Sequence, residues 1–366
     1  MGIPIEKLLK VRRPEQPLLL LMIGTIALFQ FCQIINENFS ETVFLKRFGV
    51  GYLPTTYFLN SLVFLALLFA LNPVVDRAAR TRLVSHLLLV FAVTLVCLRL
   101  LVALGLPLAY PLIYIVVKQM KYVFYIVFWT LASDIYSTRK ARRLFPLIGG
   151  GAVIGTIAGS LSSAAVRGLT GTDNVVLFTA AGMLVSWGLI GFGRRQVSRL
   201  SPVAFTAAES VTMASLGKFV RRELFGRRSG SLLGYLMLLA LLPGIVGPIY
   251  EYVFNYLADR TYHSEASLFG FFGRFKGSFN ILILACQVLV AGRAFRRFGI
   301  VNVLLAYPAG YLFAFGSLLA SFRISAAAAG RTGIEVIDAA FYKPGCQMLY
   351  NIIPAHLRGR VSALVQ

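Results

Sequence analysis

Long apolar runs recur along the whole chain, and they constrain its fold more than any other feature. Each run approaches or exceeds the ~20 residues that an α-helix needs to cross a hydrocarbon core about 30 Å thick. Short charged or Gly- and Pro-containing breaks separate the runs. Because backbone polar groups in lipid must be satisfied within the segment, the pattern predicts an all-α polytopic membrane protein rather than a soluble domain with a single anchor.

The composition supports this interpretation. Of the 366 residues, 58% are hydrophobic and 14% are charged, and the mean hydropathy is +0.76, well above what a soluble domain needs to fill a core. The runs predict about ten spanning helices. These cover residues 18–45, 52–74, 83–104, 108–136, 144–167, 174–193, 231–258, 266–291, 300–320 and 325–350. The first run reaches no small-residue cleavage site, so it is interpreted as a retained helix.

Basic residues gather in alternate loops. The chain has 36 Lys and Arg and a net charge of +22. Rich clusters lie in the N-terminal segment and at 77–82, 139–143, 194–228, 293–297 and 358–360. By the positive-inside rule, these loops and the N-terminus are cytoplasmic. Anionic membrane lipids account for the charge better than a nucleic acid, because the basic residues are split among short connectors.

The sequence has no signature of soluble enzyme chemistry, of a cofactor or of a metal site. Cys32, Cys97, Cys286 and Cys346 lie in apolar segments without metal-ligand spacing, which is typical of buried hydrophobic side chains. There is no Rossmann fingerprint, Walker A loop or HExxH motif, and the three His are scattered. We therefore expect a protein that is not an enzyme and that binds no cofactor or metal.

A long basic connector, 194–230, divides the chain into halves and is interpreted as a cytoplasmic linker with an interfacial amphipathic helix. Landmarks of the two halves are offset by 214, 216 and 216 residues, between Leu18 and Leu232, Arg77 and Arg293, and Arg142 and Arg358. Such equal offsets indicate an internal repeat. Two six-helix repeats in the same orientation, 1–193 and 231–366, predict a major facilitator superfamily-like fold. The last two helices are absent from this chain, so we expect that it is truncated or is part of a longer protein that continues by at least ~50 residues.

Ionisable side chains inside the predicted spans need an explanation, because each costs roughly 2.5 to 3.5 kcal/mol on insertion scales. Lys118 and Lys121 share a face of the fourth helix, where two cations repel unless an anion lies between them. The spacing predicts either a bound anionic substrate or pairing with Glu37 or Glu41 of the first helix.

Glu251 and Asn255 share a face of the seventh helix, after a Pro- and Gly-containing run at 243–248 that is expected to break or bend it. Broken helices line cavities in transporters. Glu251 is therefore interpreted either as a cavity residue or as an ion-pair partner of Arg274 or Lys276.

Charges on the tenth helix at spacings of four and three predict an internal ion-pair ladder. Further charges near the cytoplasmic loops are interpreted as anchors that tie helix ends together. This predicted structural charge network comprises Asp76, Arg77, Asp134, Arg331, Glu335 and Asp338. Lys343 precedes Pro344 and Gly345, which predicts a helix interruption whose freed backbone lines a cavity.

Four segments, in order, resemble the ATP/ADP translocase family, the nucleotide transporters of plastids and intracellular bacteria. They are FLKRFGVGYLP (44–54), FWTLASDIYSTRKARRLFPLIGGGAVIG (128–155), IYEYVFNYLADRTYHSEASLFGFFGRFKG (249–277) and FYKPGCQMLY (341–350). The resemblance implies a major-facilitator-like fold and is closest to bacterial members fused to HEAT-repeat or cyclic-nucleotide-binding domains. It therefore implies the bacterial inner membrane and allows a fused or associated soluble regulatory domain.

The resemblance carries over part of the family's nucleotide site. The family's first-helix lysine matches Lys46 and its seventh-helix glutamate matches Glu251. The family's fourth-helix glutamate falls near Val117, beside Lys118, and its tenth-helix lysine falls on Cys346. The resemblance thus implies the fold while half of the site charges are changed.

Together, these patterns predict a secondary transporter that moves an anionic solute by alternating access, either a nucleotide or another phosphorylated or carboxylated metabolite. Exchange or an ion gradient would drive it. The predicted substrate site comprises Lys46, Lys118, Lys121, Glu251, Asn255 and Lys343. Two other hypotheses are a non-transporting membrane sensor or scaffold coupled to soluble regulatory domains, and a lipid transporter.

Overall fold

The computed structural model describes residues 16–77, 80–136, 138–200 and 232–350, and every element in these ranges is a helix. The elements before residue 201 are α2 (Gln16–Val43), η2 (Phe44–Phe48), η3 (Val50–Tyr52), α3 (Leu53–Arg77), α4 (Arg80–Ala103), α5 (Ala109–Ile135), α6 (Thr138–Thr170) and α7 (Val175–Leu200). Those after residue 231 are α9 (Leu232–Thr261), α10 (Glu265–Cys286), η4 (Gln287–Ala291), α11 (Gly292–Ala320), α12 (Ile324–Ile337), η5 (Asp338–Tyr342) and α13 (Lys343–Tyr350).

Eight helices in the described ranges are long and apolar enough to cross a membrane, by length and composition, and the chain is a multi-pass membrane protein. They are Gln16–Phe48, Val50–Leu71, Thr81–Ala103, Ala109–Ile135, Arg143–Thr170, Val175–Gly193, Glu265–Ile300 and Asn302–Ala320. Each corresponds to one of the predicted spans. The two other predicted spans, 231–258 and 325–350, correspond to α9 and to α12 with η5 and α13.

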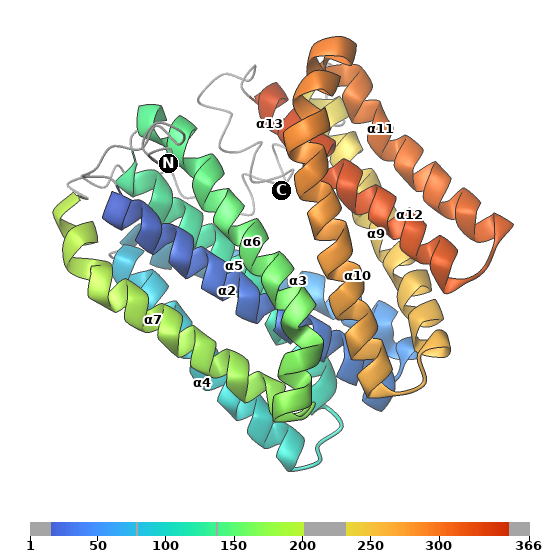
Figure 1. Cartoon of the computed structure of the whole chain (residues 1–366), viewed down its shortest axis with the longest axis horizontal. Helices are drawn as coiled ribbons and strands as arrows, with labels where there is room; N and C mark the ends of the chain where they lie inside the picture. Colours follow the sequence, from blue (N-terminus) through green and yellow to red (C-terminus); the bar gives the residue numbers. More distant parts are fainter. Residues whose placement is uncertain (1–15, 78–79, 137, 201–231, 351–366) are drawn as a thin grey trace, which may run out of the picture. The chain divides into compact units, whose positions relative to one another are not determined.

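Two features of the helices differ from the sequence-based expectation. α9 continues unbroken through the Pro- and Gly-containing run at 243–248. A proline ring crowds the carbonyl four residues earlier, and before Pro248 that position is Gly244, where a peptide can tilt most freely. The stretch 293–297, predicted as a loop, is helical, and the chain reverses at Gly299, whose φ of 74° favours glycine. Figure 1 shows this reversal near the start of α11.

Contacts divide the chain into two units, which are described separately. The first comprises Met1–Ala207 with Tyr262–Ser278, and the second comprises Ala208–Thr261 with Phe279–Gln366. The first part of α10, which the sequence repeat assigns to the second half, therefore packs within the first unit. The predicted bundles 1–193 and 231–366 are halves of an internal repeat. A division of the chain by contacts does not test a repeat, so these bundles stay a prediction. Most of the predicted linker 194–230 lies outside the described residues.

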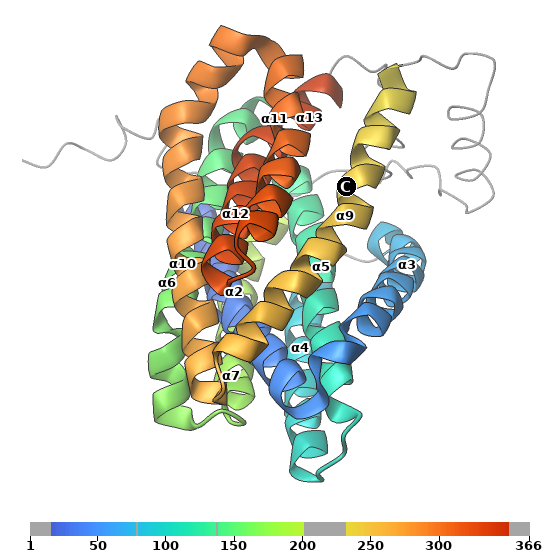
Figure 2. The ribbon, with the colours of Figure 1, turned by 90° about the vertical axis from the view of Figure 1, so that its right-hand side faces the viewer.

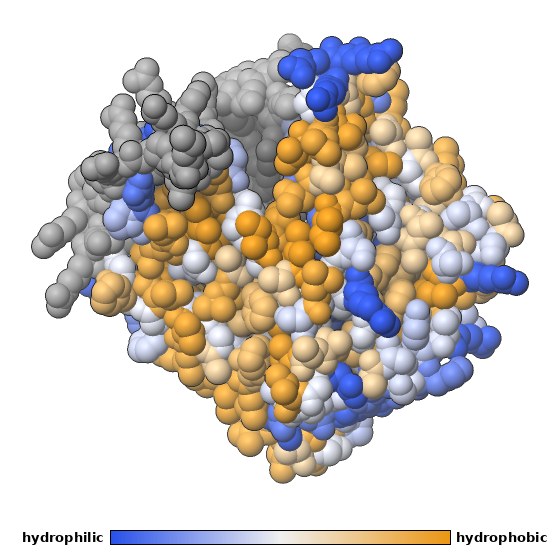
Figure 3. Space-filling view, viewed as in Figure 1, coloured by the Kyte–Doolittle hydropathy of each residue, from blue (hydrophilic) through white to orange (hydrophobic). Residues whose placement is uncertain are grey.

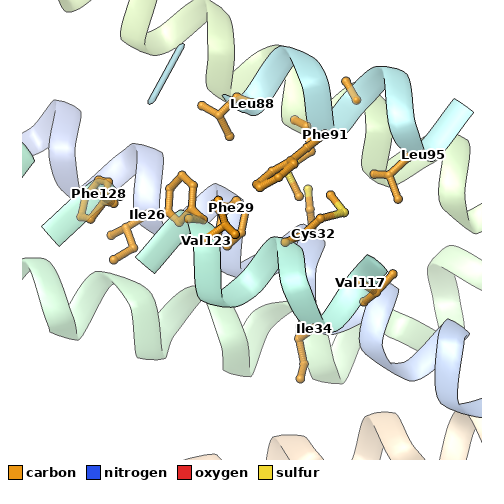
Figure 4. Close-up of a cluster of buried hydrophobic side chains, with 14 of the residues drawn as sticks. Ile26, Phe29, Cys32, Ile34, Leu88, Phe91, Leu95, Val117, Val123 and Phe128 are labelled. Carbon is orange, nitrogen blue, oxygen red and sulfur yellow. The ribbon is translucent and has the colours of Figure 1, made fainter. Parts of the chain in front are cut away.

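In the first unit, α2 packs against α5, α6 and α7, and α4 packs against α5 and α7 (Figure 1). Aromatic side chains fill the space between α2, α4 and α5. The rings of Phe29 and Phe124 stack with their centroids 3.5 Å apart, and the Phe91 ring lies 6.3 Å from that of Phe29. Figure 4 shows Ile26, Phe29 and Val123 in this cluster. This apolar packing fixes the position of α2 inside the unit.

Glycines let α6 approach two neighbouring helices. A Cβ at Gly155 would lie 2.1 Å from the carbonyl oxygen of Ala27 on α2, and Gly159 is similarly close to the next turn of α2. On α10, a Cβ at Gly273 would lie 2.7 Å from the carbonyl oxygen of Ser160. Small residues at four-residue spacing are a common way for membrane helices to pack closely. α6 therefore positions both α2 and the start of α10, which carry charged residues.

In the second unit, α12 packs against α9 and α11 (Figure 2). The Tyr250 hydroxyl of α9 donates a hydrogen bond to the Ala327 carbonyl of α12 at 2.9 Å. A Cβ at Gly330 would lie 2.2 Å from that hydroxyl oxygen, so glycine makes room for the tyrosine. Tyr250 also meets Phe315 of α11 edge to face, at 5.3 Å between centroids. Tyr250 thus joins the three helices.

Large apolar side chains point outward from the first unit. Phe192 is 93% exposed, and Leu161 and Val185 are more than half exposed. Figure 3 shows apolar residues over much of the face that α6 and α7 present in this view. Such a surface suits a hydrocarbon environment rather than water.

Candidate functional site

The second half of α2 carries a run of polar side chains that are buried within the first unit. Each is at most 4% exposed: Gln33, Asn36, Glu37, Asn38, Ser40, Glu41 and Thr42. Burying so many polar groups in a spanning helix is costly unless they find partners. Of these residues, only Glu37 and Glu41 were predicted to interact with the lysines of the fourth helix. The signal that the sequence analysis missed is the amide-rich stretch around them, NENFSET, at the end of an apolar run.

Glu41 contacts two ammonium groups that come from different helices. Its Oε1 lies 3.0 Å from Lys118 Nζ of α5, and its Oε2 lies 2.7 Å from Lys276 Nζ of α10. The side chains of Glu41 and Lys276 are 4% and 7% exposed, whereas that of Lys118 is 18% exposed. Pairing at this depth offsets part of the desolvation cost of the charges.

Glu37, one turn earlier on α2, contacts the second lysine of α5. Lys121 Nζ lies 3.0 Å from Glu37 Oε1, and Gln33 Nε2 donates to the Val117 carbonyl at 2.7 Å. The carboxylates are four residues apart and the lysines three apart, so both rows present neighbouring charges on one helix face. The structure contains the ion pairs that the sequence analysis weighed against a bound anion. That Lys118 and Lys121 bind a substrate stays a prediction.

In the ion pairs described above, three lysines (Lys118, Lys121 and Lys276) share two carboxylates (Glu37 and Glu41). Lys276 was predicted only as a partner of Glu251, and its contact with Glu41 was missed. The sequence alone gave no indication that α10 lies beside α2, because that packing depends on the close approach of α10 to α6. We call these five side chains the lysine–glutamate cluster.

Buried amides near the cluster retain unused hydrogen-bonding capacity. Asn38 Nδ2 donates to Ser163 Oγ at 2.9 Å, and Thr179 Oγ1 donates to Asn36 Oδ1 at 2.6 Å. Asn36 Nδ2 and Asn38 Oδ1 have no hydrogen-bond partner among the described residues. Buried groups of this kind commonly bind ordered water.

The π-helix η2 carries Lys46, which is partly buried, and Arg47, to which the sequence analysis gave no role. Arg47 Nη1 lies 2.7 Å from Asp173 Oδ1. Its Nε and Nη2 donate to the two carboxylate oxygens of Glu265 at 2.6 and 2.9 Å. Such bidentate pairs are both strong and geometrically specific. Arg47 therefore joins η2 to the α6–α7 connection and to the first residue of α10. Lys46 as a substrate residue stays a prediction.

In the second unit, Glu251 contacts Arg331 of α12, whereas its predicted partners Arg274 and Lys276 belong to the first unit. Arg331 Nη2 lies 3.6 Å from Glu251 Oε1, and its Nε lies 3.9 Å from Glu335 Oε1 on the same helix. The Arg331 guanidinium also lies 4.7 Å from the ring centroid of Phe254. Asn255, predicted with Glu251 in the substrate site, is 1% exposed. The site roles of Glu251 and Asn255 stay predictions.

Asp338, predicted to continue the ladder from Glu335, contacts Lys343 instead. Lys343 Nζ lies 2.5 Å from Asp338 Oδ2, and the lysine side chain is 67% exposed. The pair spans the π-helix η5, so the predicted interruption before Pro344 takes the form of a π-turn, after which α13 continues the chain. Gln287 Nε2 of η4 donates to the Ala339 carbonyl of η5 at 3.0 Å. Two π-turns are therefore linked directly, and such turns are frequent at functional sites.

Three predicted anchor residues remain. Asp134 lies partly buried in the last turn of α5. Asp76 and Arg77 lie at the end of α3, where the side chains are outside the described part of the structure. Among the described side chains, no group of three or more His, Cys, Asp or Glu could hold a metal ion.

Comparison with known proteins identifies similar solved structures. No protein-family model and no curated protein sequence matches this chain. The crystal structure of the nucleoside transporter NupG has a TM-score of 0.62 at 14% identity, over 95% of this chain and 86% of that chain. A mutant of NupG gives the same TM-score at 16% identity, with the same coverage. An inward-facing, unoccupied bacterial homolog of the human lysosomal transporter Spinster gives 0.62 at 15% identity, over 97% of this chain and 79% of that chain.

These similarities define the fold. The chain has an all-α, major facilitator superfamily-like fold, as the repeated landmarks of the sequence predicted. At this identity, the similarity carries no information on a substrate.

Proposed function

We propose that this chain is the membrane domain of a secondary transporter that moves an anionic solute by alternating access. The fold supports the transporter class, because similar structures belong to transporters. The observation that supports an anionic substrate is the lysine–glutamate cluster. In this cluster three ammonium groups contact two carboxylates between apolar helices. Three cations that share two carboxylates repel one another in a low-dielectric site, so a further anion would be favoured there.

The ATP/ADP translocase resemblance implies that the substrate is a nucleotide. Another phosphorylated metabolite would interact with the same lysines of the cluster. The side chains of Lys118 and Lys121 are 18% and 38% exposed, so both retain accessible surface while paired. On the proposed mechanism, these lysines contact the solute, and Lys46, Glu251, Asn255 and Lys343 contribute at other points of its path. Exchange or an ion gradient drives the movement, and the protein lies in a bacterial inner membrane with its N-terminus in the cytoplasm.

The test is uptake of labelled ATP, ADP and simple organophosphates by proteoliposomes that contain the purified protein. We expect saturable uptake that falls at least tenfold in Lys118→Ala and in Lys121→Ala. The matched control is Lys140→Ala, an exposed lysine near the start of α6, which should transport as the wild type does. Uptake that is unchanged in both variants would show that the cluster is structural.

A protein that neither binds nor transports any anion would overturn the proposal. Transport of labelled phospholipid between leaflets would then favour a lipid transporter. Absence of all transport, together with a stable fold, would favour a sensor or scaffold coupled to soluble regulatory domains.

A further inference from the structure

Glu41 occupies a position that an anion could also occupy. Each of its two oxygens contacts a different ammonium group, Lys118 Nζ at 3.0 Å and Lys276 Nζ at 2.7 Å. The two lysines come from α5 and α10, so the carboxylate bridges two helices through one planar acid group. A phosphoryl group, or the carboxylate of a small acid, also presents two negatively charged oxygens in a geometry that suits such bidentate contacts.

Lys276 reaches Glu41 because α10 packs closely against α6. Lys276 is 7% exposed, and the neighbouring Gly273 and Gly277 allow α10 to approach α6, since a Cβ at either would lie 2.7 Å from an atom of α6. The Lys276 ammonium also lies 5.6 Å from the ring centroid of Phe272. Folding has therefore already removed most of the water around the Lys276 ammonium group. The free-energy cost of that desolvation does not oppose the binding of an anion.

We propose that Glu41 is an internal counter-ion that the substrate displaces, so that an oxyacid group of the substrate binds between Lys118 and Lys276. This inference rests on the proposed function and names the part of the substrate that the cluster recognises. The partly exposed side of Lys118 is the route of entry, because Lys276 and Glu41 are more deeply buried. The two ion pairs of Glu41 compete with the substrate and weaken its binding.

Glu41→Gln tests this competition. Glutamine keeps the size of the side chain but has one acceptor oxygen and no charge, so it satisfies only one of the two lysines. The probe is inorganic pyrophosphate, with citrate as the carboxylate counterpart, titrated by calorimetry against purified protein. We expect pyrophosphate to bind at least ten times more tightly to Glu41→Gln, which corresponds to about 1.4 kcal/mol, the scale of one charge-assisted hydrogen bond.

The matched control is Glu37→Gln, which removes the same charge one turn away, where the contacts with Lys121 and Gln33 are affected and those of Glu41 are not. If the gain came from the general field of the cluster, both variants would bind pyrophosphate equally tightly, and the inference would fail while the transporter proposal stood. If only citrate binding tightens in Glu41→Gln, the substrate group that displaces Glu41 is a carboxylate rather than a phosphoryl group. Binding of neither probe to any form overturns this inference and the anionic substrate together.

A second variant decides the matter even if Glu41→Gln does not fold. Lys276→Met removes one side of the proposed site and leaves Lys118 and Lys121 in place. We expect its pyrophosphate affinity to fall at least tenfold, in protein whose thermal unfolding remains cooperative. Wild-type affinity in folded Lys276→Met would exclude Lys276 from the site and overturn the inference.

Discussion

Lys276 is the most deeply buried lysine of the lysine–glutamate cluster, with 7% of its side chain exposed and its ammonium 2.7 Å from Glu41. Lys276→Met leaves Glu41 paired with Lys118 but removes its shorter and more deeply buried ion pair, and a charge-assisted hydrogen bond of this kind contributes about 1.5 to 3 kcal/mol. We therefore expect Lys276→Met to unfold at a clearly lower temperature than the wild type in detergent.

Arg274, two residues earlier on α10, is exposed and provides the control. Arg274→Gln should change the unfolding temperature little, because exposed charges contribute roughly 0 to 1 kcal/mol. Equal unfolding temperatures for the two variants would show that Lys276 does not stabilise the first unit through Glu41.

At this scale, the sequence predicted only part of the candidate site. The spacings of Glu37 and Glu41 on one helix, and of Lys118 and Lys121 on another, were enough to suggest pairing, because helical periodicity fixes which side chains share a face. The third lysine was not predictable in this way. Its contact depends on the packing of α10 against α6, and no local pattern encodes which helices become neighbours.

Close contact between α2 and α6 depends on positions without a side chain. Gly155 and Gly159 meet backbone carbonyls of α2 at distances that exclude a Cβ. Alanine at either position forces the helices apart, and overpacking of this kind costs about 1 to 3 kcal/mol. We expect Gly155→Ala and Gly159→Ala to lower the unfolding temperature, and Gly159→Ala to weaken pyrophosphate binding as well, because α2 carries Glu37 and Glu41.

Gly149 lies on the same helix, with no atom within 4 Å of a Cβ built there. Gly149→Ala should be neutral or slightly stabilising, since alanine favours the helix by roughly 1 kcal/mol. A comparable loss of stability in all three alanine variants would mean that glycine is needed for helix flexibility rather than for the α2–α6 contact.

The elements themselves were predicted well where hydropathy decides them. The ranges of the spans follow from apolar runs of sufficient length, and eight of the ten recur as candidate spans in the described part of the chain. Apart from the interruption next to Lys343, the local irregularities were not predicted. The reversal at Gly299 lies just after a basic stretch that resembles a loop in composition, and the π-turns at η2, η4 and η5 depend on tertiary packing that the periodicity of the sequence does not contain.

Arg47 connects segments that are far apart in the sequence, because it contacts both Asp173 and Glu265. Its loss should release the start of α10 from the rest of the first unit. We expect Arg47→Gln to increase the rate of hydrogen exchange in the segment 262–278, measured by mass spectrometry in detergent.

Arg99 offers a matched arginine, since its Nε donates to Asn174 in the same α6–α7 connection. Arg99→Gln should alter exchange in that connection but leave 262–278 unchanged. If exchange in 262–278 is the same in wild type and Arg47→Gln, other contacts hold α10 in place.

The distribution of basic residues predicts the orientation of the whole molecule. In protein without its native cysteines, Leu108→Cys, in the exposed connection before α5, should react with a membrane-impermeant maleimide in intact cells. Lys140→Cys, in a basic stretch, should react only after lysis, because the positive-inside rule places it in the cytoplasm. The reverse pattern would invert the topology.

The π-turn at Asp338–Tyr342 affects how this chain should be aligned with any relative. A π-turn accommodates an additional residue within an otherwise α-helical segment. A homologous helix without it would present a different residue at each equivalent point beyond the turn, rotated by about 100° around the axis. Cys346 lies four residues after the turn, and the sequence resemblance places the translocase family's tenth-helix lysine on it. If that family's helix has no π-turn, the residue of this chain that matches the lysine in three dimensions is a neighbour of Cys346. Structure-based superposition, rather than residue counting from FYKPG, is therefore the basis on which functional positions in the last helix should be assigned.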